Sequence, residues 1–170
     1  MVFLLIVTLA IATVSAGIVA GYVFAYANSV MPGLAEVDDR VFVVANQRLN
    51  ARVENPVFFA VSTTPVIALL IATGTAAFIP NAGLVLGACV LALAAYGGGM
   101  AVTFTINVPL NRALIALRNG ADANALRSAR VAFERPWARA NRLRTWLMVL
   151  ALAGTTTALA LTVLTPSARI

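Results

Sequence analysis

Residues 55–111 read NPVFFAVSTTPVIALLIATGTAAFIPNAGLVLGACVLALAAYGGGMAVTFTINVPLN and contain no Asp, Glu, Lys or Arg. A helix needs ~20 apolar residues to cross the hydrocarbon core of a bilayer, so this uncharged stretch is long enough for two crossings. The turn-forming sequence Pro80-Asn81-Ala82-Gly83 divides it and predicts helices over residues 57–78 and 83–107. Because the connection is so short, the two helices are expected to be antiparallel neighbours.

The N-terminal stretch predicts a further membrane span over residues 2–28, since the first charged residue of the chain is Glu36. A secretory signal peptide is the alternative, because Ala25-Tyr26-Ala27 resembles a small-residue cleavage site. The stretch has no positively charged n-region and its apolar run is longer than that of a signal peptide, which favours a retained span. Met31-Pro32-Gly33 is predicted to end this helix, since proline and glycine disfavour its continuation.

Two polar segments separate the spans. Residues 35–53 carry apolar side chains at helical spacing, which predicts an amphipathic helix that lies along the membrane interface or packs across the mouth of the bundle. In residues 108–144, Asp122 is placed to cap a short helix that Pro136 interrupts. A last helix then carries Trp137, Asn141 and Arg144 and enters the membrane as the span over residues 145–164. The predicted class is therefore all-α: a transmembrane four-helix bundle with short amphipathic or interfacial helices in the two long loops.

The composition excludes an ordinary soluble protein and predicts one integral membrane domain over residues 1–170. Of the 170 residues, 61% are hydrophobic and 11% are charged, against roughly 25% charged in soluble domains; the mean hydropathy is +0.93. The net charge is +6. Its basic residues are all arginines that flank the apolar spans, which indicates contact with anionic membrane lipid and argues against nucleic-acid binding.

The arginines also predict the orientation of the chain. All but Arg169 lie in the two long polar segments. By the positive-inside rule, these two loops face the cytoplasm and both termini face outward, as in a multi-pass protein of the inner (plasma) membrane. Two G-x3-G pairs, Gly17 with Gly21 and Gly83 with Gly87, are compatible with a homo-oligomer or with membership of a larger membrane complex.

Two groups of polar residues flank the spans. Asn107 and Asn111 are four residues apart and share a helix face if the helix continues past Pro109; they either bond to the local backbone or point amides at a ligand. Trp137, Asn141 and Arg144 follow the spacing i, i+4 and i+7. That face suits a planar oxygenated ring, or is an interfacial tryptophan beside orienting arginines.

Other candidates for chemistry are few. Glu54, Asp39 and Glu134 are the carboxylates that suit a general base, and Glu54, just before the second span, is preferred to the others; a salt bridge to an arginine is the alternative for each. Tyr96, beside Gly97-Gly98-Gly99, is a candidate substrate contact at a local cavity. The chain has no histidine and one cysteine, so we expect no protein-bound metal.

The arrangement resembles the anthrone oxygenase-like family of small four-helix integral membrane proteins, most of which have no assigned function. Four short motifs carry the resemblance in the expected order: Met31-Pro32-Gly33-Leu34, Asn55-Pro56, Asn107-x-Pro-Leu-Asn111 and Trp137-x3-Asn141-x2-Arg144. The resemblance implies that Asn107, Asn111, Trp137, Asn141 and Arg144 line a site. The family pattern often has histidine where this chain has Asn141, which removes a natural base.

The resemblance further implies oxidation of a planar phenolic or anthrone-like substrate by O2 at the cytoplasmic mouth of the bundle, without metal, flavin or another cofactor. In that reaction Arg144, Asn141 and Glu54 would be catalytic, and Asn107, Asn111, Trp137 and Tyr96 would bind the substrate. The alternative is a non-catalytic membrane protein: a scaffold, a lipid-binding protein or an accessory subunit of a membrane complex.

Overall fold

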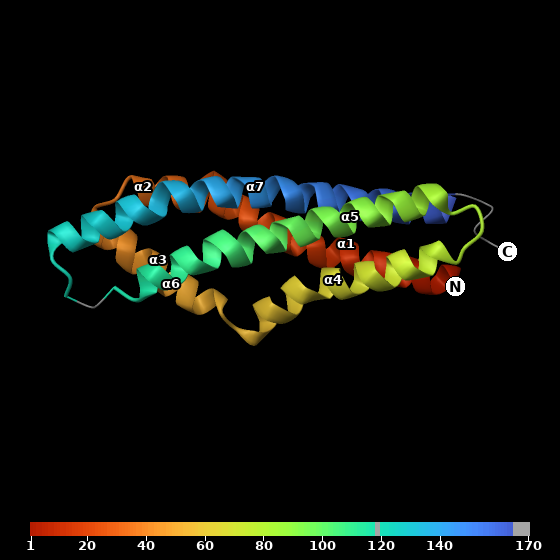
Figure 1. Cartoon of the computed structure of the whole chain (residues 1–170), viewed down its shortest axis with the longest axis horizontal. Coiled ribbons are helices and arrows are strands. Elements are labelled where there is room, and N and C mark those ends of the chain that lie inside the picture. Colours follow the sequence, from red (N-terminus) through yellow and green to blue (C-terminus); the bar gives the residue numbers. More distant parts are fainter. Residues whose placement is uncertain (118–119, 165–170) are drawn as a thin grey trace.

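The protein is an elongated bundle of four long helices, described by a computed structural model for residues 1–117 and 120–164 (Figure 1). The four are α1 (Val2–Ala25), α4 (Pro56–Ala77), α5 (Gly83–Val102) and α7 (Ala123–Leu164). α1 packs against α4 and α7, and α5 packs against the same two helices. The predicted all-α class is confirmed. Arg118 and Arg169, two of the arginines used for orientation, lie outside the described residues.

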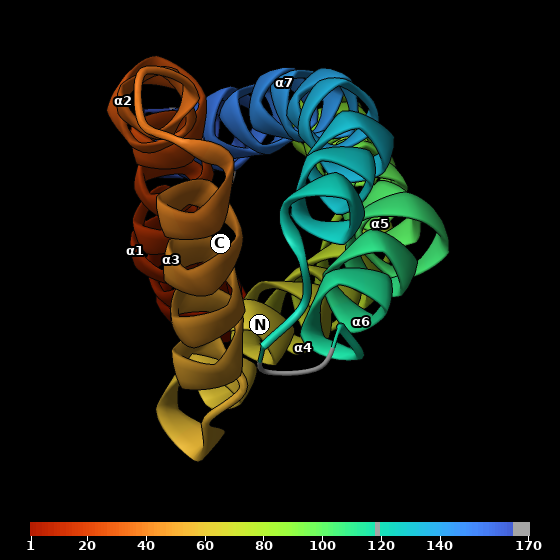
Figure 2. The ribbon, with the colours of Figure 1, turned by 90° about the vertical axis from the view of Figure 1, so that its left-hand side faces the viewer.

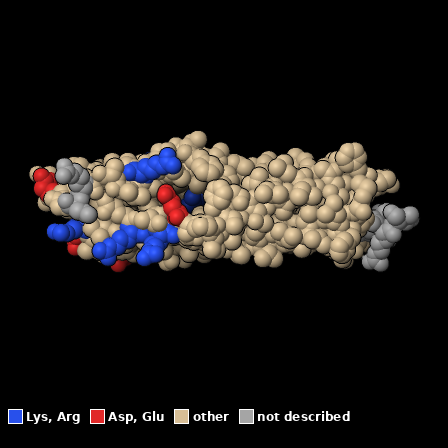
Figure 3. Space-filling view, turned by 90° about the horizontal axis from the view of Figure 1, so that it is seen from below, with Lys and Arg blue, Asp and Glu red and all other residues tan. Residues whose placement is uncertain are grey.

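The surface divides the bundle into an uncharged shaft and a charged cap. Four helical stretches are long and apolar enough to span a membrane: Val2–Ala35, Pro56–Ala77, Gly83–Ile115 and Ala123–Leu164. Figure 3 shows basic and acidic side chains gathered at one end and none on the visible face of the shaft. The chain is thus a multi-pass membrane protein, with the cap formed by the ends of its helices and the segments between them.

The central hairpin forms as predicted. The Asn55 side chain caps α4 by accepting a hydrogen bond of 2.9 Å from the Phe58 backbone N–H, and Pro56 occupies the first turn. Asn81 has φ 61° in the turn between α4 and α5, a left-handed conformation that asparagine tolerates better than most residues. The spans predicted over residues 57–78 and 83–107 therefore correspond to α4 and to α5 with its extension.

Two prolines expected near helix ends instead lie inside continuous helices. α1 continues through a π-helical turn, η1 (Tyr26–Val30), into α2 (Met31–Ala35). α5 continues in the same way through η2 (Thr103–Asn107) into α6 (Val108–Ile115). The prediction that Met31-Pro32-Gly33 ends the first helix is wrong, and residues 108–115 are helical rather than a loop.

Each π turn has the same relation to a proline. η1 ends two residues before Pro32, and η2 ends two residues before Pro109. In an α-helix the proline ring clashes with the carbonyl four residues earlier. A π turn widens the helix at that point, which relieves the clash without ending the helix.

The last helix also differs from its prediction. α7 runs unbroken over 42 residues with Pro136 inside it; at 1.5 Å per residue this is about 63 Å, roughly twice the hydrocarbon thickness of a bilayer. Pro136 and Ala132, whose carbonyl the proline leaves unbonded, are both exposed, so water can satisfy that carbonyl. The predicted break at Pro136 is therefore wrong, because the helices expected before and after it are one helix; the predicted Asp122 cap is present, with Ala125 N–H donating to it at 2.8 Å.

The segment predicted to be amphipathic forms α3 (Asp39–Val53), capped by Asp38, which accepts a hydrogen bond of 2.9 Å from the Val41 N–H. Seen from the charged end, α3 lies on one side of the cap and α6 with the start of α7 on the other (Figure 2). Side chains of the cap core fill the space between them: Tyr26, Met31, Phe42, Val43, Leu114, Phe133 and Trp137. The cap therefore has an aromatic core of its own.

In the shaft, α5 and α7 pack closely enough at one point to require a glycine. A Cβ added at Gly154 of α7 would lie 3.0 Å from Ala92 Cβ and 3.3 Å from the Ala88 carbonyl oxygen of α5. Among the G-x3-G pairs, a Cβ added at Gly17 would make an ordinary contact with Leu152. A Cβ added at Gly21, Gly83 or Gly87 would meet no described atom within 4 Å. Close packing within this chain therefore depends on Gly154 rather than on those three glycines.

Candidate functional site

The candidate site lies on α7 between the two π turns, at the boundary between the cap and the shaft. Trp137, Asn141 and Arg144 share one face of α7 and are all buried, as their spacing predicted. α7 contacts η1 on one side and η2 on the other. π turns occur often at functional sites, and here two of them, from helices on opposite corners of the bundle, border the same three side chains.

Arg144 is buried, with 9% of its surface exposed. Its guanidinium donates to Asn141 Oδ1 at 2.6 Å and to Thr103 Oγ1 at 3.3 Å, and lies 5.9 Å from the centre of the Trp137 ring. No carboxylate within the described part of the chain pairs with it, and its Nε has no hydrogen-bond partner there. A buried cation without a counter-ion is costly, and it favours the binding of an anionic oxygen.

Asn141 positions Arg144 by joining α7 to α1. Its amide nitrogen donates to the Val23 carbonyl at 3.0 Å while its oxygen accepts from Arg144. The Thr145 hydroxyl lies 3.3 Å from the same carbonyl. The amide is therefore held at both ends, so Asn141 orients the guanidinium and has little freedom to act as a base.

Asn107 and Asn111 lie on the helix that continues past Pro109, and both contact Trp137. The Trp137 indole N–H donates to Asn111 Oδ1 at 2.7 Å, and the Asn107 amide nitrogen lies 3.4 Å from the Trp137 carbonyl oxygen. Asn107 is 1% exposed, and its Oδ1 has no partner within the described chain. Asn111 thus fixes the indole, while Asn107 keeps a buried acceptor available.

Aromatic rings form a continuous wall beside these polar groups. Neighbouring ring centres lie 5.0–6.1 Å apart along the series Phe42, Phe133, Trp137, Tyr26, Tyr22 and Phe58. The series joins α3 in the cap to the first turn of α4. Such surfaces favour stacking or edge contact with another planar ring. The sequence motifs identified Trp137 only, because the tyrosines come from a span with no polar motif around them.

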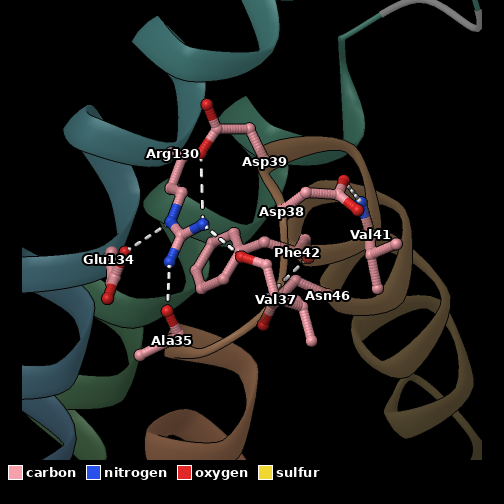
Figure 4. Close-up of polar contacts among 9 residues, drawn as sticks. All are labelled: Ala35, Val37, Asp38, Asp39, Val41, Phe42, Asn46, Arg130 and Glu134. Atoms are coloured by element: carbon pink, nitrogen blue, oxygen red, sulfur yellow. Dashed lines mark hydrogen bonds and ion pairs between the residues drawn. The ribbon is translucent and has the colours of Figure 1, made fainter.

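The cap is held over the site by Arg130, which reaches from α7 to the segment before α3 (Figure 4). Its guanidinium donates to Glu134 at 2.7 Å and to Asp39 at 3.1 Å, and to the carbonyls of Val37 and Ala35 at 2.7 Å each. It also lies 4.6 Å from the centre of the Phe42 ring. The hydrogen bond to Glu134 is the main cause that raises the pKa of Arg130 above its ordinary value.

The remaining candidates lie elsewhere. Asp39 and Glu134 form the predicted kind of ion pair with an arginine. Glu54 is exposed at the end of α3, and no ion pair of Glu54 occurs within the described residues. Tyr96 is fully buried in the core of the shaft, where its hydroxyl donates to the Ser62 carbonyl at 2.8 Å. Tyr96 therefore joins α5 to α4 just before Pro65.

Two openings lead toward the site. A cavity of about 170 Å³ between α2 and α7 reaches Asn141 and is lined also by Pro32, Glu134 and Arg142. On another face, Figure 3 shows a recess at the boundary of cap and shaft, with a basic side chain set back in it and an acidic side chain at its edge. The buried polar groups thus lie close to the surface at the level where the charged cap begins.

Comparison with known proteins agrees with this arrangement. The family model described as anthrone oxygenase matches residues 55–154, which extend from the cap of α4 to the close contact at Gly154 and include Asn107, Asn111 and the α7 face. No curated protein and no solved structure matches the chain. Because the matched residues are more than half of the chain and contain the buried polar cluster, the chain belongs to the anthrone oxygenase family.

Proposed function

We propose that this protein is a cofactor-independent oxygenase that uses O2 to oxidise a planar phenolic, anthrone-like substrate at the mouth of the bundle. The observation that carries the proposal is the buried guanidinium of Arg144, which has no carboxylate partner and one unpaired N–H among the described residues. Proteins seldom bury such a charge without a functional reason. An anionic oxygen of a bound substrate would complete its hydrogen bonds.

The chemistry requires little beyond charge stabilisation and shape. Loss of a proton from the ring methylene gives an electron-rich enolate, whose oxyanion Arg144 stabilises. The enolate passes one electron to O2, and the resulting carbon radical and superoxide combine to a peroxide that is protonated and loses water. One anthrone and one O2 thus give one anthraquinone and one water. Water, or Glu54, which is exposed at the end of α3, accepts the first proton.

The test is oxygen consumption by purified protein in lipid nanodiscs with 1,8-dihydroxyanthrone as the probe. We expect consumption above the spontaneous rate, with one anthraquinone formed for each O2 used and no loss of rate after treatment with a metal chelator. A rate no higher than that of empty nanodiscs would overturn the proposal. It would favour the non-catalytic alternative of a scaffold, a lipid-binding protein or an accessory subunit.

We also infer that the cap lies in the cytoplasm and that both termini lie outside, in the inner (plasma) membrane. The support is the arginine-rich surface of the cap, which the positive-inside rule assigns to the cytoplasm and which suits anionic lipid.

Single-cysteine labelling tests this orientation. Cys89 is fully buried and gives little background. In intact cells, a membrane-impermeant maleimide is expected to label Pro80→Cys, in the turn at the far end of the shaft, and not Ser128→Cys in the cap. Both positions are exposed. Labelling of Ser128→Cys alone would mean that the orientation is reversed.

A further inference from the structure

Asn50 is a buried amide of the cap that no motif identified and that lies outside the residues matched by the family model. It is 5% exposed, and its amide nitrogen has no hydrogen-bond partner among the described residues. Buried polar groups are paired in the great majority of cases, so an unpaired one indicates a missing partner such as a ligand or water. Asn50 shares this property with Asn107 Oδ1 and Arg144 Nε.

α3 crosses the cap from its contact with α7 to the start of α4. Phe42 of α3 contacts Phe133 of α7, and from there α3 runs obliquely away from α7 (Figures 1 and 2). Asn50 follows Phe42 by eight residues, which is about 12 Å further along α3 at 1.5 Å per residue.

Contacts between α3 and α6 place Asn50 near Asn111. The Gln47 side chain donates to the carbonyls of Leu114 at 2.9 Å and Leu117 at 3.2 Å. Because α3 runs toward the membrane and α6 away from it, Asn50 lies about one turn nearer the shaft, opposite the turn of α6 that contains Asn111. These contacts therefore place Asn50 beside the turn of α6 whose Asn111 accepts the hydrogen bond of the Trp137 indole.

We propose that Asn50 binds the substrate and selects planar aromatic compounds that carry a second oxygen, in addition to the one bound by Arg144. This inference rests on the proposed function in one respect: the proposed function supplies the expectation that the ligand is a planar aromatic ring. Of the six buried side-chain atoms without a partner in the described residues, three are hydroxyls of α1 and α4, and the other three belong to Arg144, Asn50 and Asn107. These last three define the polar pattern of the ligand: two donors, from Arg144 and Asn50, require two acceptor oxygens, and the Asn107 acceptor requires one hydroxyl. The aromatic wall supplies a stacking surface for the ring.

Asn46 provides a matched control, because it is the same residue type on the same buried face of α3, one turn earlier. Its amide nitrogen already donates to the Phe42 carbonyl at 2.9 Å (Figure 4). Asn46→Leu therefore changes the polarity and shape of α3 in the same way as Asn50→Leu. It does not remove a donor that is free to bind a ligand, because the Asn46 amide is already bonded to the backbone.

The experiment measures anaerobic binding of two probes, 1,8-dihydroxyanthrone and unsubstituted anthrone, which carries a single oxygen, to the full chain in nanodiscs. Quenching of Trp137 fluorescence reports binding in a Trp146→Phe background, since Trp146 is 72% exposed on the shaft. For Asn50→Leu we expect about a tenfold loss of affinity for the hydroxylated probe, as for one lost buried hydrogen bond. Affinity for unsubstituted anthrone is expected to stay within twofold, and Asn46→Leu is expected to change neither affinity.

An unchanged ratio of the two affinities in Asn50→Leu would overturn the inference, and so would an equal change of the ratio in Asn46→Leu. If Asn50→Leu does not fold, Asn50→Ser is measured instead, because the serine side chain is too short to donate to the same oxygen. The ratio of the two affinities is expected to change as for Asn50→Leu. Because binding is measured without O2, selective binding in a protein that does not consume oxygen would contradict the proposed function and leave this inference standing.

Discussion

Replacing Arg144 by methionine is expected to reduce kcat for oxygen consumption by about 10²–10³-fold, the usual effect of removing one group that stabilises an oxyanion in a water-excluded site. Methionine keeps much of the side-chain volume and removes the charge. Arg144→Lys is expected to recover part of the rate at most, because an ammonium cannot bond to Asn141, Thr103 and a substrate with the planar geometry of a guanidinium.

The same substitution has an unusual expected effect on stability. Arg144 has no carboxylate partner in the described chain, so its replacement leaves no charge unpaired and removes the cost of burying one. It also leaves the buried Asn141 Oδ1 without a donor, which costs about 1–3 kcal/mol, and because the two effects oppose each other we expect Arg144→Met to melt close to the wild-type temperature. Loss of activity without loss of stability distinguishes a functional residue from a structural one.

Arg139 provides the control for charge alone, since it is an exposed arginine on the same helix. Arg139→Met is expected to keep the wild-type rate in the oxygen-electrode assay. The oxyanion role of Arg144 would be wrong if Arg144→Met consumed oxygen at the wild-type rate, or if Arg139→Met lost as much activity.

Replacing Arg130 by methionine is expected to release α3 from α7 and to destabilise the cap by about 2–3 kcal/mol, the usual range for losing charge-assisted hydrogen bonds that are only partly buried. The residue bonds to two carboxylates and two carbonyls and lies over the Phe42 ring. No other described side chain bonds to the carbonyls of Ala35 and Val37, so the segment before α3 would lose those contacts.

Hydrogen exchange measures this effect locally. In Arg130→Met we expect faster amide exchange over residues 39–53 and unchanged exchange over residues 57–77 in the shaft. Arg127→Met is the control, because Arg127 is exposed one turn earlier on α7 and makes no ion pair within the described residues. Equal protection of α3 in both variants would contradict the role of Arg130. Oxygen consumption is also expected to fall in Arg130→Met, since a loosened cap admits water to the site.

The order of residues was sufficient to predict the membrane spans. An uncharged run as long as residues 55–111 is expected to form membrane-spanning helices. Lipid offers no hydrogen-bond partners to the backbone, and within such a run only a helix pairs every backbone N–H and C=O with another group of the same segment. The amphipathic α3 followed from local spacing, and the shared face of Trp137, Asn141 and Arg144 from helical periodicity. These features depend on neighbours within a few turns of the same helix.

The prolines were interpreted wrongly for a physical reason. Local rules treat Pro32, Pro109 and Pro136 as breaks, but a π turn before the first two and an exposed carbonyl before the third let the helices continue. Pro32 and Pro109 share one pattern: each comes two residues after the end of a π turn in a helix that continues. Because the helices continue, they extend into the cap. Asn107 and Asn111 then lie on one face of their helix, and both contact Trp137 of α7.

Only the tertiary structure decided which polar residues are buried. Arg139, Arg142 and Arg144 are alike in type and lie close together in the chain, but only Arg144 is buried. Its environment comes from Thr103, and that of Asn141 from Val23, residues 41 and 118 positions away in the sequence. Whether a charge is buried and what satisfies it depend on packing between distant helices, which no local pattern records. The same holds for Asn50, which the hydrogen bonds of Gln47 to α6 place beside that helix.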